Sequence, residues 1–201
     1  MKYTYQPDTT KFFASVRTSV FDGKLSQLQV DGINSVLEAF DGYDIRQLAY
    51  VLATVYHETA HTMQPVKEGG KGAGYDYGKK LKRGGGKGKR IPYTTPDKIY
   101  YGRGYIQVTW YENYEGLTKA AKKAGKNWDF LNNPELLLED EPSIWAAQYG
   151  MTVGLYTGRK LSDYFNDKKT DPLGARDIIN SGDRAALIAT YYKWFLNGLM
   201  A

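Results

Sequence analysis

Apolar residues recur every three or four positions along most of this 201-residue chain, and that spacing restricts the chain to mainly helical folds. The pattern predicts helices over about 26–41, 44–63, 111–123, 142–155 and 183–199. Asp44 is expected to cap the second of these helices, and Pro65 is expected to end it. Only residues 105–110 form a short β-like run. The sequence therefore predicts an all-α or α-rich α+β fold.

Residues 64–101 break this helical spacing. Nine glycines lie between Gly69 and Gly88, and glycine and lysine at this density cannot build a core. We therefore expect a long, flexible basic loop at about 67–92, and loops of this length are usually functional or disordered. The segment from Lys67 to Arg90 holds nine Lys and Arg residues against two acidic ones, so its charge is +7 and that of the remaining chain is −2. Such a patch indicates an anionic partner (nucleic acid, a membrane surface or an anionic cell wall), or else a solvated, mobile loop.

Length and composition limit the remaining possibilities. A chain of 201 residues is expected to form a single domain that spans 1–201, and we expect a monomer. The absence of cysteine excludes disulfides and thiolate metal sites, and it fits a reducing compartment. Residues 1–8 contain no apolar stretch of the signal-peptide kind, and no window has the roughly 18 consecutive apolar residues of a membrane span. We therefore expect a soluble protein that is made in the cytoplasm without a signal peptide.

The pentapeptide His57-Glu58-Thr59-Ala60-His61 has two chemical interpretations. On a helix, the pattern His-Glu-x-x-His places two imidazoles one turn apart to bind zinc, with the glutamate as general base. A zinc peptidase also needs a third protein ligand. Because the chain has only these two histidines, that ligand would be a carboxylate such as Glu112 or Glu115.

In the second interpretation Glu58 is a carboxylic acid that donates a proton. On the predicted helix it lies at the border between the buried stripe and solvent, where partial desolvation disfavours the charged form of a carboxyl. A glycosidase needs a second carboxylate. Glu68 is the candidate, since it opens the flexible basic loop, although it is also compatible with a plain surface position. Asp76 is the alternative base.

Three segments resemble motifs of one enzyme family. Residues 49–58, which end in His-Glu, are similar to the catalytic helix of glycoside hydrolase family 19, which holds class I chitinases and many phage or prophage endolysins. Residues 101–114 resemble the family's Gly-Arg-Gly-x-Ile-Gln signature with its following Asn-Tyr, and residues 175–182 resemble its Ile-Asn-Gly-Gly segment. The three segments occur in the family's order over most of residues 30–195. The resemblance implies a lysozyme-like, mainly α fold with a central cleft between two lobes, and an inverting glycoside hydrolase.

The resemblance also implies a role for individual residues. Glu58 is implied to be the general acid, Glu68 the general base, and Thr109 a hydroxyl that helps to hold the attacking water. Five residues are implied to bind substrate: His57, Tyr101, Gln107, Asn113 and Asn180. Amides offer paired donors and acceptors to N-acetyl groups, and aromatic rings contact sugar faces. No metal and no cofactor are expected.

Structural roles remain open for several of these residues. The alternatives are buried amides that tie loops together for Gln107 and Asn180, a strand residue for Thr109, a scaffold contact for Arg103 and simple packing for His61. The sequence also departs from the family pattern. Ser181 stands where a glycine is expected, the loop is unusually basic, the disulfides of the plant enzymes are absent, and the family's late arginine has Arg184 as its only candidate.

Chitin and peptidoglycan share β-1,4-linked N-acetylated sugars, so these motifs do not separate the two substrates. The absence of a recognisable chitin-binding module and the cationic loop favour peptidoglycan. We therefore predict an endolysin-type muramidase that reaches the wall through a holin or a secretion system, with its basic loop against the anionic wall or outer membrane. The alternatives are a chitinase, the zinc peptidase, and a non-catalytic nucleic-acid-binding protein that uses Lys67–Arg90 with Tyr75 and Tyr77; we expect no nucleic-acid partner.

Overall fold

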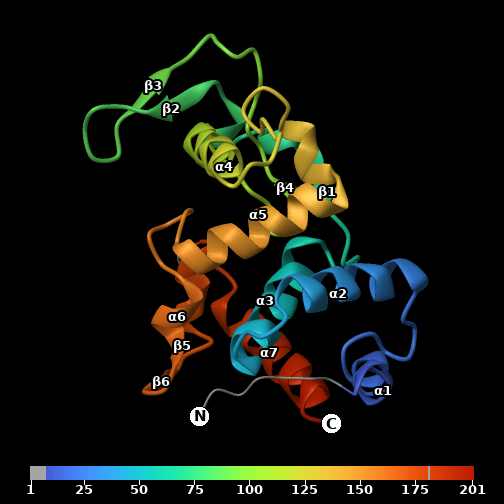
Figure 1. Cartoon of the computed structure of the whole chain (residues 1–201). Coiled ribbons are helices and arrows are strands. Elements are labelled where there is room, and N and C mark those ends of the chain that lie inside the picture. The colour runs from blue at the N-terminus through green and yellow to red at the C-terminus, as the bar shows by residue number, and fades with distance from the viewer. Residues whose placement is uncertain (1–7, 181) are drawn as a thin grey trace. The chain divides into compact units, whose positions relative to one another are not determined.

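The computed structural model describes residues 8–180 and 182–201 (Figure 1). These residues form seven α-helices: α1 (Thr9–Ser19), α2 (Gln27–Ala39), α3 (Ile45–Glu58), α4 (Tyr111–Lys123), α5 (Asp140–Val153), α6 (Leu161–Tyr164) and α7 (Ala185–Leu199). The sheets are three antiparallel two-stranded pairs: β1 (Val66–Lys67) with β4 (Arg103–Gly104), β2 (Leu81–Arg83) with β3 (Arg90–Pro92), and β5 (Phe165–Asn166) with β6 (Lys169–Thr170). Four 3-10 turns complete the described elements: η1 (Gly69–Gly72), η2 (Asp76–Gly78), η3 (Pro134–Leu138) and η4 (Gly174–Ile178). The prediction of a mainly α fold is confirmed.

The chain divides into two compact units. The terminal unit consists of Met1–Gln64 and Gln148–Ala201, and the middle unit consists of Pro65–Ala147. The chain leaves the terminal unit after α3 and returns to it inside α5. Within the described residues no helix is long and apolar enough to cross a membrane.

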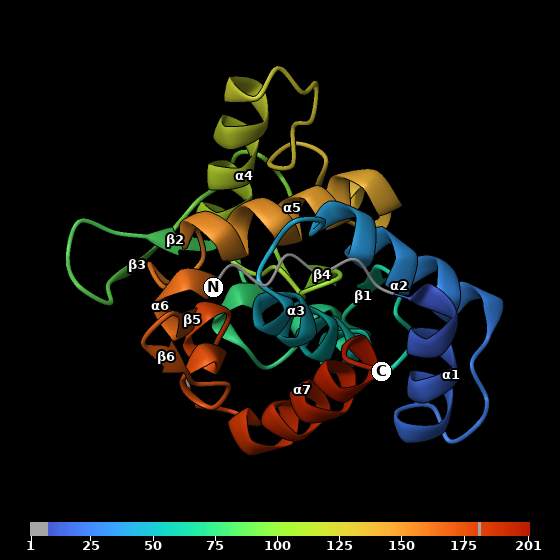
Figure 2. The same ribbon diagram turned by 60° about the horizontal axis from the view of Figure 1, so that its bottom comes forward.

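Helix α3 is the centre of the terminal unit. Every residue from Leu48 to Tyr56 is buried, so the helix is covered on all sides rather than along one stripe. It packs against α7 and α2, and α1 packs against the end of α7, where Gly198 lies close to Val16 (Figure 2). Asp44 caps α3 as predicted, because its side chain accepts a hydrogen bond from the backbone N–H of Arg46.

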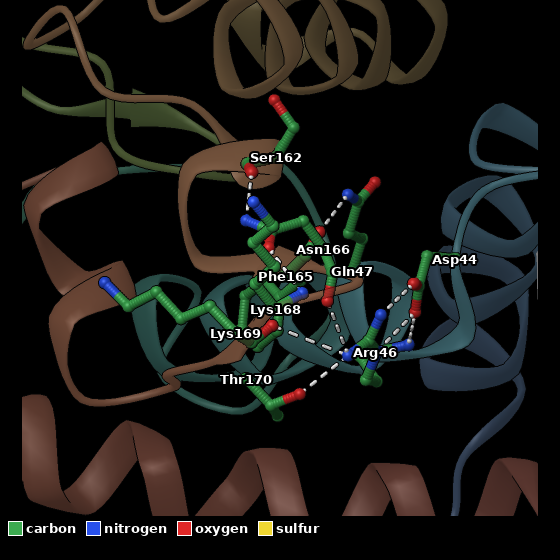
Figure 3. Close-up of polar contacts among 9 residues, drawn as sticks. All are labelled: Asp44, Arg46, Gln47, Ser162, Phe165, Asn166, Lys168, Lys169 and Thr170. Atoms are coloured by element: carbon green, nitrogen blue, oxygen red, sulfur yellow. Dashed lines mark hydrogen bonds and ion pairs between the residues drawn. The ribbon is translucent and has the colours of Figure 1, made fainter. Parts of the chain in front are cut away.

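The start of α3 is fixed by the β5–β6 hairpin (Figure 3). The Arg46 guanidinium donates to the carbonyl oxygen of Asn166 at 3.2 Å and to Oγ1 of Thr170 at 2.7 Å, and it also pairs with Asp44 at 2.5 Å. Gln47 donates to the carbonyl oxygen of Phe165 at 3.0 Å. Burial opposes the charged form of Asp44, but the hydrogen bonds and the charge of Arg46 outweigh it and lower the pKa of Asp44.

Helix α3 ends at Glu58, five residues earlier than the hydrophobic spacing predicts. Three residues that follow have left-handed backbone: Ala60 (φ 49°), His61 (φ 69°) and Met63 (φ 55°). The turn is held from inside, because the Thr59 hydroxyl donates to the carbonyl oxygen of Val55 and accepts from the N–H of Met63. Tertiary packing has therefore overridden the helical pattern at this point.

Glycine at position 32 of α2 is required by the same turn. A Cβ on Gly32 would lie 1.6 Å from the carbonyl oxygen of Met63, which is itself fully buried. The backbone of α2 thus lies directly against the turn that follows Glu58, and any larger residue would push the two apart.

The middle unit is built from short elements around α4. Tyr114, Leu117 and Ala121 are buried on α4, and the rings of Tyr93 and Tyr100 join them. The range 64–101, where we expected a loop, contains β1, two 3-10 turns and the β2–β3 hairpin instead. The β-like run at 105–110 is not a strand. Among residues 8–180 and 182–201 its only β-bridge joins Val108 and Arg103, and Gln107 and Trp110 have left-handed backbone.

Candidate active site

Glu58 is the last residue of α3, and its carboxylate is held by a buried cation. Its Oε1 accepts a hydrogen bond from Nη1 of Arg176 at 2.5 Å, and the two side chains are 14% and 4% exposed. Arg176 belongs to η4 and also donates from Nε to the carbonyl oxygen of Asp183 at 2.9 Å. We expected partial desolvation alone at Glu58; the structure adds an ion pair with Arg176.

Arg176 was missed in the sequence analysis. The candidate for the late arginine was Arg184, which is 64% exposed and lies 3.8 Å from Asp183. The available signal was the position of Arg176 itself, one residue into the segment 175–182 that carries the third motif. Nothing in the local spacing showed that this side chain turns inward.

The two histidines are not arranged as the His-Glu-x-x-His pattern on a helix predicts. His57 is half-buried on α3, and burial lowers its pKa; His61 follows the end of the helix and stacks on Tyr56, with ring centroids 4.1 Å apart. The imidazoles are therefore not presented one turn apart on a helix, as the His-Glu-x-x-His zinc motif requires. Among residues 8–180 and 182–201, no three His, Cys, Asp or Glu side chains are grouped as metal ligands would be. His61 is exposed but stacks on Tyr56, which agrees with the packing role considered for it.

The carboxylates considered as third zinc ligands are used elsewhere. Glu112 pairs with Arg90, and Glu115 pairs with Lys119 at 2.8 Å. Both lie in the middle unit, whereas the histidines lie in the terminal unit.

Asn180 follows η4 and is exposed, and its backbone N–H donates to the carbonyl oxygen of Arg176 at 2.9 Å. Its side chain is therefore not the buried amide that was one of the two alternatives. The neighbouring Ser181 lies outside the described residues.

Glu68 lies in the middle unit, between β1 and η1, and two donors fix its carboxylate. Oε1 accepts from the Tyr77 hydroxyl at 2.8 Å, and Oε2 accepts from the backbone N–H of Gly102 at 3.1 Å. Burial and the hydrogen bond to Glu68 raise the pKa of the Tyr77 phenol, so the phenol remains a donor at neutral pH. Glu68 is thus not a plain surface glutamate, and it faces the first glycine of the Gly102-Arg103-Gly104 motif.

Tyr77 is the second residue that sequence reasoning did not find as a site residue. Its ring packs edge-on against Trp110 at 5.8 Å between centroids and parallel to Tyr75 at 5.1 Å. The Arg90 guanidinium covers the Trp110 ring at 3.5 Å. The carboxylate of Glu68 is therefore supported by a stack of aromatic and guanidinium groups.

Asp76, the alternative base, has a different environment. Its side chain is 59% exposed and pairs with Lys79 at 2.7 Å, and this hydrogen bond and charge lower the pKa of Asp76. No described residue links it to the Gly-Arg-Gly motif. The structure favours Glu68 over Asp76 as a positioned carboxylate.

The remaining predicted site residues of the middle unit make structural contacts. Gln107 donates to the carbonyl oxygens of Val66 at 2.8 Å and Gly104 at 3.1 Å, which ties β1 to β4. Asn113 donates to the carbonyl oxygen of Thr109 at 2.8 Å, and both residues are partly exposed. Their predicted contacts with sugar and water remain predictions.

Tyr101 is buried against a scaffold arginine. Its side chain is 7% exposed, and the Arg103 guanidinium lies 3.6 Å from its ring. Arg103 is also buried and pairs with Glu135 at 2.9 Å, so it has the scaffold role that was expected as its alternative. The ring of Tyr101 is therefore largely covered, and its predicted contact with sugar remains a prediction.

Comparison with known proteins agrees with this description. The family profile described as "Chitinase class I", glycoside hydrolase family 19, matches residues 39–152, which is more than half of the chain and includes Glu58 and Glu68. No curated protein matches the chain significantly.

Solved structures show the same fold at low sequence identity. A bacterial family 19 chitinase has a TM-score of 0.59 at 21% identity, with 94% of this chain and 93% of that chain covered. The class IV chitinase of Zea mays has a TM-score of 0.56 at 19% identity, with 94% of each chain covered. Chitinase C of Streptomyces griseus HUT6037 has a TM-score of 0.53 at 20% identity, with 96% of this chain and 76% of that chain covered. The lysozyme-like, mainly helical fold class is thereby confirmed.

Proposed function

This chain belongs to the class I chitinase family, glycoside hydrolase family 19, and on that premise we propose that it is an endolysin-type muramidase that cuts the glycan strands of peptidoglycan by inverting hydrolysis. Membership of the family makes it a glycoside hydrolase for chitin-like β-1,4-linked N-acetylated sugars. The choice of peptidoglycan within that class is the proposal. The observation that carries the catalytic part is the placement of Glu58 at the end of the buried helix α3, with its carboxylate on Arg176.

Glu58 is proposed as the general acid. Its proton goes to the glycosidic oxygen while the bond between that oxygen and the anomeric carbon breaks. The Glu58 carboxylate lies against the Arg176 guanidinium. The same guanidinium then stabilises the anion that remains after the proton has been given away.

Glu68 is proposed as the general base. It accepts a proton from the water whose oxygen bonds to the anomeric carbon on the opposite face of the sugar, and this inverts the configuration. Inverting enzymes hold their two carboxyl groups roughly 6.5–9.5 Å apart so that a water fits between them. The Tyr77 hydroxyl and the Gly102 N–H, which occupy one side of the Glu68 carboxylate, fix the direction of its remaining lone pairs. We further propose that Thr109 helps to hold this water, and that His57, Tyr101, Gln107, Asn113 and Asn180 contact the sugars.

Peptidoglycan is favoured over chitin by charge. Chitin is neutral, whereas the peptide stems of peptidoglycan carry carboxylates, and the segment from Lys67 to Arg90 has seven excess positive charges. The protein would act on the wall after a holin or a secretion system delivers it from the cytoplasm, as a single catalytic domain and a monomer. Chitinase activity is the second candidate, because the solved structures with the same fold include chitinases.

The test is digestion of purified peptidoglycan in EDTA, with the soluble products identified by mass spectrometry. Wild type is expected to release new reducing ends that carry N-acetylmuramic acid, and Glu58→Gln is expected to release none. Glu38→Gln, which changes an exposed glutamate of α2, is the matched control and should behave as wild type. Cleavage of chitin oligomers with intact peptidoglycan would show a chitinase, and N-acetylglucosamine at the new ends would show a glucosaminidase.

A further inference from the structure

The β2–β3 hairpin of the middle unit is an ordered cationic surface. Its strands pair Leu81 with Pro92, Lys82 with Ile91 and Arg83 with Arg90. Across the tip, the N–H of Gly84 donates to the carbonyl oxygen of Lys89 at 2.8 Å. The charges of the hairpin are therefore carried on a defined turn and not on a free chain.

Most of the positive charge on this hairpin is not neutralised. Between Lys79 and Arg90 there are seven Lys and Arg residues and no acidic residue. Three carboxylates from neighbouring segments pair with four of these seven residues: Asp76 with Lys79, Asp97 with Lys80, and Glu112 with both Arg83 and Arg90. In the described part of the chain, Lys87 and Lys89 at the tip are exposed and have no carboxylate partner, and the Arg83 side chain is 70% exposed. The charge is concentrated at the end that faces solvent.

The hairpin is attached to the residues that hold Glu68. Arg90 of β3 pairs with Glu112 and covers the Trp110 ring, and Trp110 contacts Tyr77, which donates to Glu68. Lys82 of β2 lies over the ring of Tyr111, with its ammonium 5.2 Å from the centroid. A polymer bound at the hairpin would therefore be held at a fixed place relative to Glu68.

We propose that Arg83, Lys87 and Lys89 bind the stem-peptide carboxylates of peptidoglycan, so that the β2–β3 hairpin selects acidic N-acetylated glycans over neutral ones. This inference rests on the proposed function, because it concerns the substrate of the same site. Exposed ion pairs are individually weak, so selectivity comes from several of them acting along one polymer. Their contribution depends on ionic strength, because exposed charges are screened within about 8 Å at physiological salt.

The experiment compares one glycan in two charge states. Peptidoglycan is used as purified and after amidation of its carboxyl groups. The variant Lys87→Gln/Lys89→Gln removes the tip charges, and Lys122→Gln/Lys123→Gln removes two exposed lysines at the end of α4 as a charge-matched control. For the tip variant, the ratio of kcat/KM on native to amidated peptidoglycan should fall about 5-fold, through KM, and the fall should be smaller at high salt. The control should keep the wild-type ratio.

A binding measurement separates this inference from the proposed function. Cosedimentation of the Glu58→Gln protein with native or amidated peptidoglycan requires no catalysis, so it can be read even if wild type releases no reducing ends. Stronger binding to the native polymer that disappears in the tip variant supports the hairpin surface. Equal binding to both polymers, or an equal loss in the Lys122/Lys123 control, would overturn it. Retention by anionic lipid vesicles or DNA at concentrations where native peptidoglycan is not bound would also overturn it.

Discussion

The terminal unit and the middle unit each hold one of the two candidate catalytic carboxylates, and they do so by different physical means. Glu58 ends a fully buried helix and meets a buried guanidinium that follows it by 118 residues. Glu68 lies between a two-residue strand and a 3-10 turn, and its carboxylate is held by a phenol and a backbone N–H. The first carboxylate is positioned by a hydrophobic core and an ion pair, and the second by hydrogen bonds and ring stacking.

This difference indicates how each unit responds to substitution. An uncompensated charge left behind by a lost buried partner is costly, so changes around Glu58 should affect folding as well as catalysis. A hydrogen bond between partly exposed groups contributes less to the free energy of unfolding than a buried ion pair does. Changes around Glu68 should therefore lower the catalytic rate before they lower stability.

The largest expected effect is loss of the proposed acid, Glu58. Glu58→Gln keeps the shape of the side chain but removes its proton, and kcat should fall by roughly 10³-fold, within the range seen for general acids. The measurement is initial rate on peptidoglycan, with thermal unfolding alongside. If Glu58→Gln retains more than about a tenth of the wild-type activity, Glu58 is not the general acid, and the terminal unit does not supply a catalytic carboxylate.

The second prediction concerns the buried cation. Arg176→Met should lower the free energy of unfolding by about 3 kcal/mol, because the Glu58 carboxylate loses its partner in a buried position. Urea denaturation measures this change. Arg184→Met is the control, since Arg184 is exposed in the same segment, and it should stay within about 0.5 kcal/mol of wild type. In the background of Glu58→Gln the cost of Arg176→Met should be clearly smaller, and an unchanged cost would show that the ion pair is not its cause.

A smaller and purely kinetic effect is expected from the phenol in the middle unit. Tyr77→Phe removes the donor to Glu68 but keeps the ring on Trp110, so kcat should fall about 10-fold with little change in the unfolding midpoint. Tyr75→Phe is matched to it, since Tyr75 lies in the same stack and is exposed. Equal rates for the two variants would remove Tyr77 from the positioning of Glu68.

The smallest effect is expected from the ion pair between Asp44 and Arg46 at the start of α3. Arg46 lowers the pKa of Asp44 below its ordinary value of 3.8. The folded protein therefore binds this proton less readily than the unfolded chain does, so the stabilisation is complete above pH 3.8 and disappears as the pH falls below it. Asp44→Asn should have a lower free energy of unfolding than wild type at pH 6, and this free energy should decrease less steeply as the pH falls below 3.8. Urea denaturation over a pH series measures both. Asp41→Asn, an exposed neighbour, should follow wild type at every pH.

Features that depend on the local spacing of residues could be predicted from the sequence. Helical periodicity predicted α3, α4 and α7, and Asp44 was identified as a cap from its position before an apolar run. Glu58 and Glu68 were chosen from residue type, spacing and the resemblance to a known family. Features that depend on contacts between distant residues were not predictable in the same way.

Three examples show the limit. The left-handed turn at Ala60 and His61 ends α3 against its own pattern, because Gly32 allows α2 to approach that turn. Arg176 reaches Glu58 only through the tertiary fold, and the sequence offered Arg184 as the candidate in its place. Tyr77 was considered only as part of a basic tract, because its hydrogen bond to Glu68 depends on the turns between them.

The assembly of the terminal unit from both ends of the chain has a consequence for synthesis. A ribosome makes Glu58 long before Arg176 and α7, and at roughly 5–20 residues per second the delay is on the order of 10 s. The contacts within the middle unit can form during that interval, since they need only Pro65–Ala147. Helix α3 can pack against α7, and Glu58 can pair with Arg176, only after the whole middle unit has been made. In a hydrolase of this design the residues around Glu58 come together later in synthesis than those around Glu68.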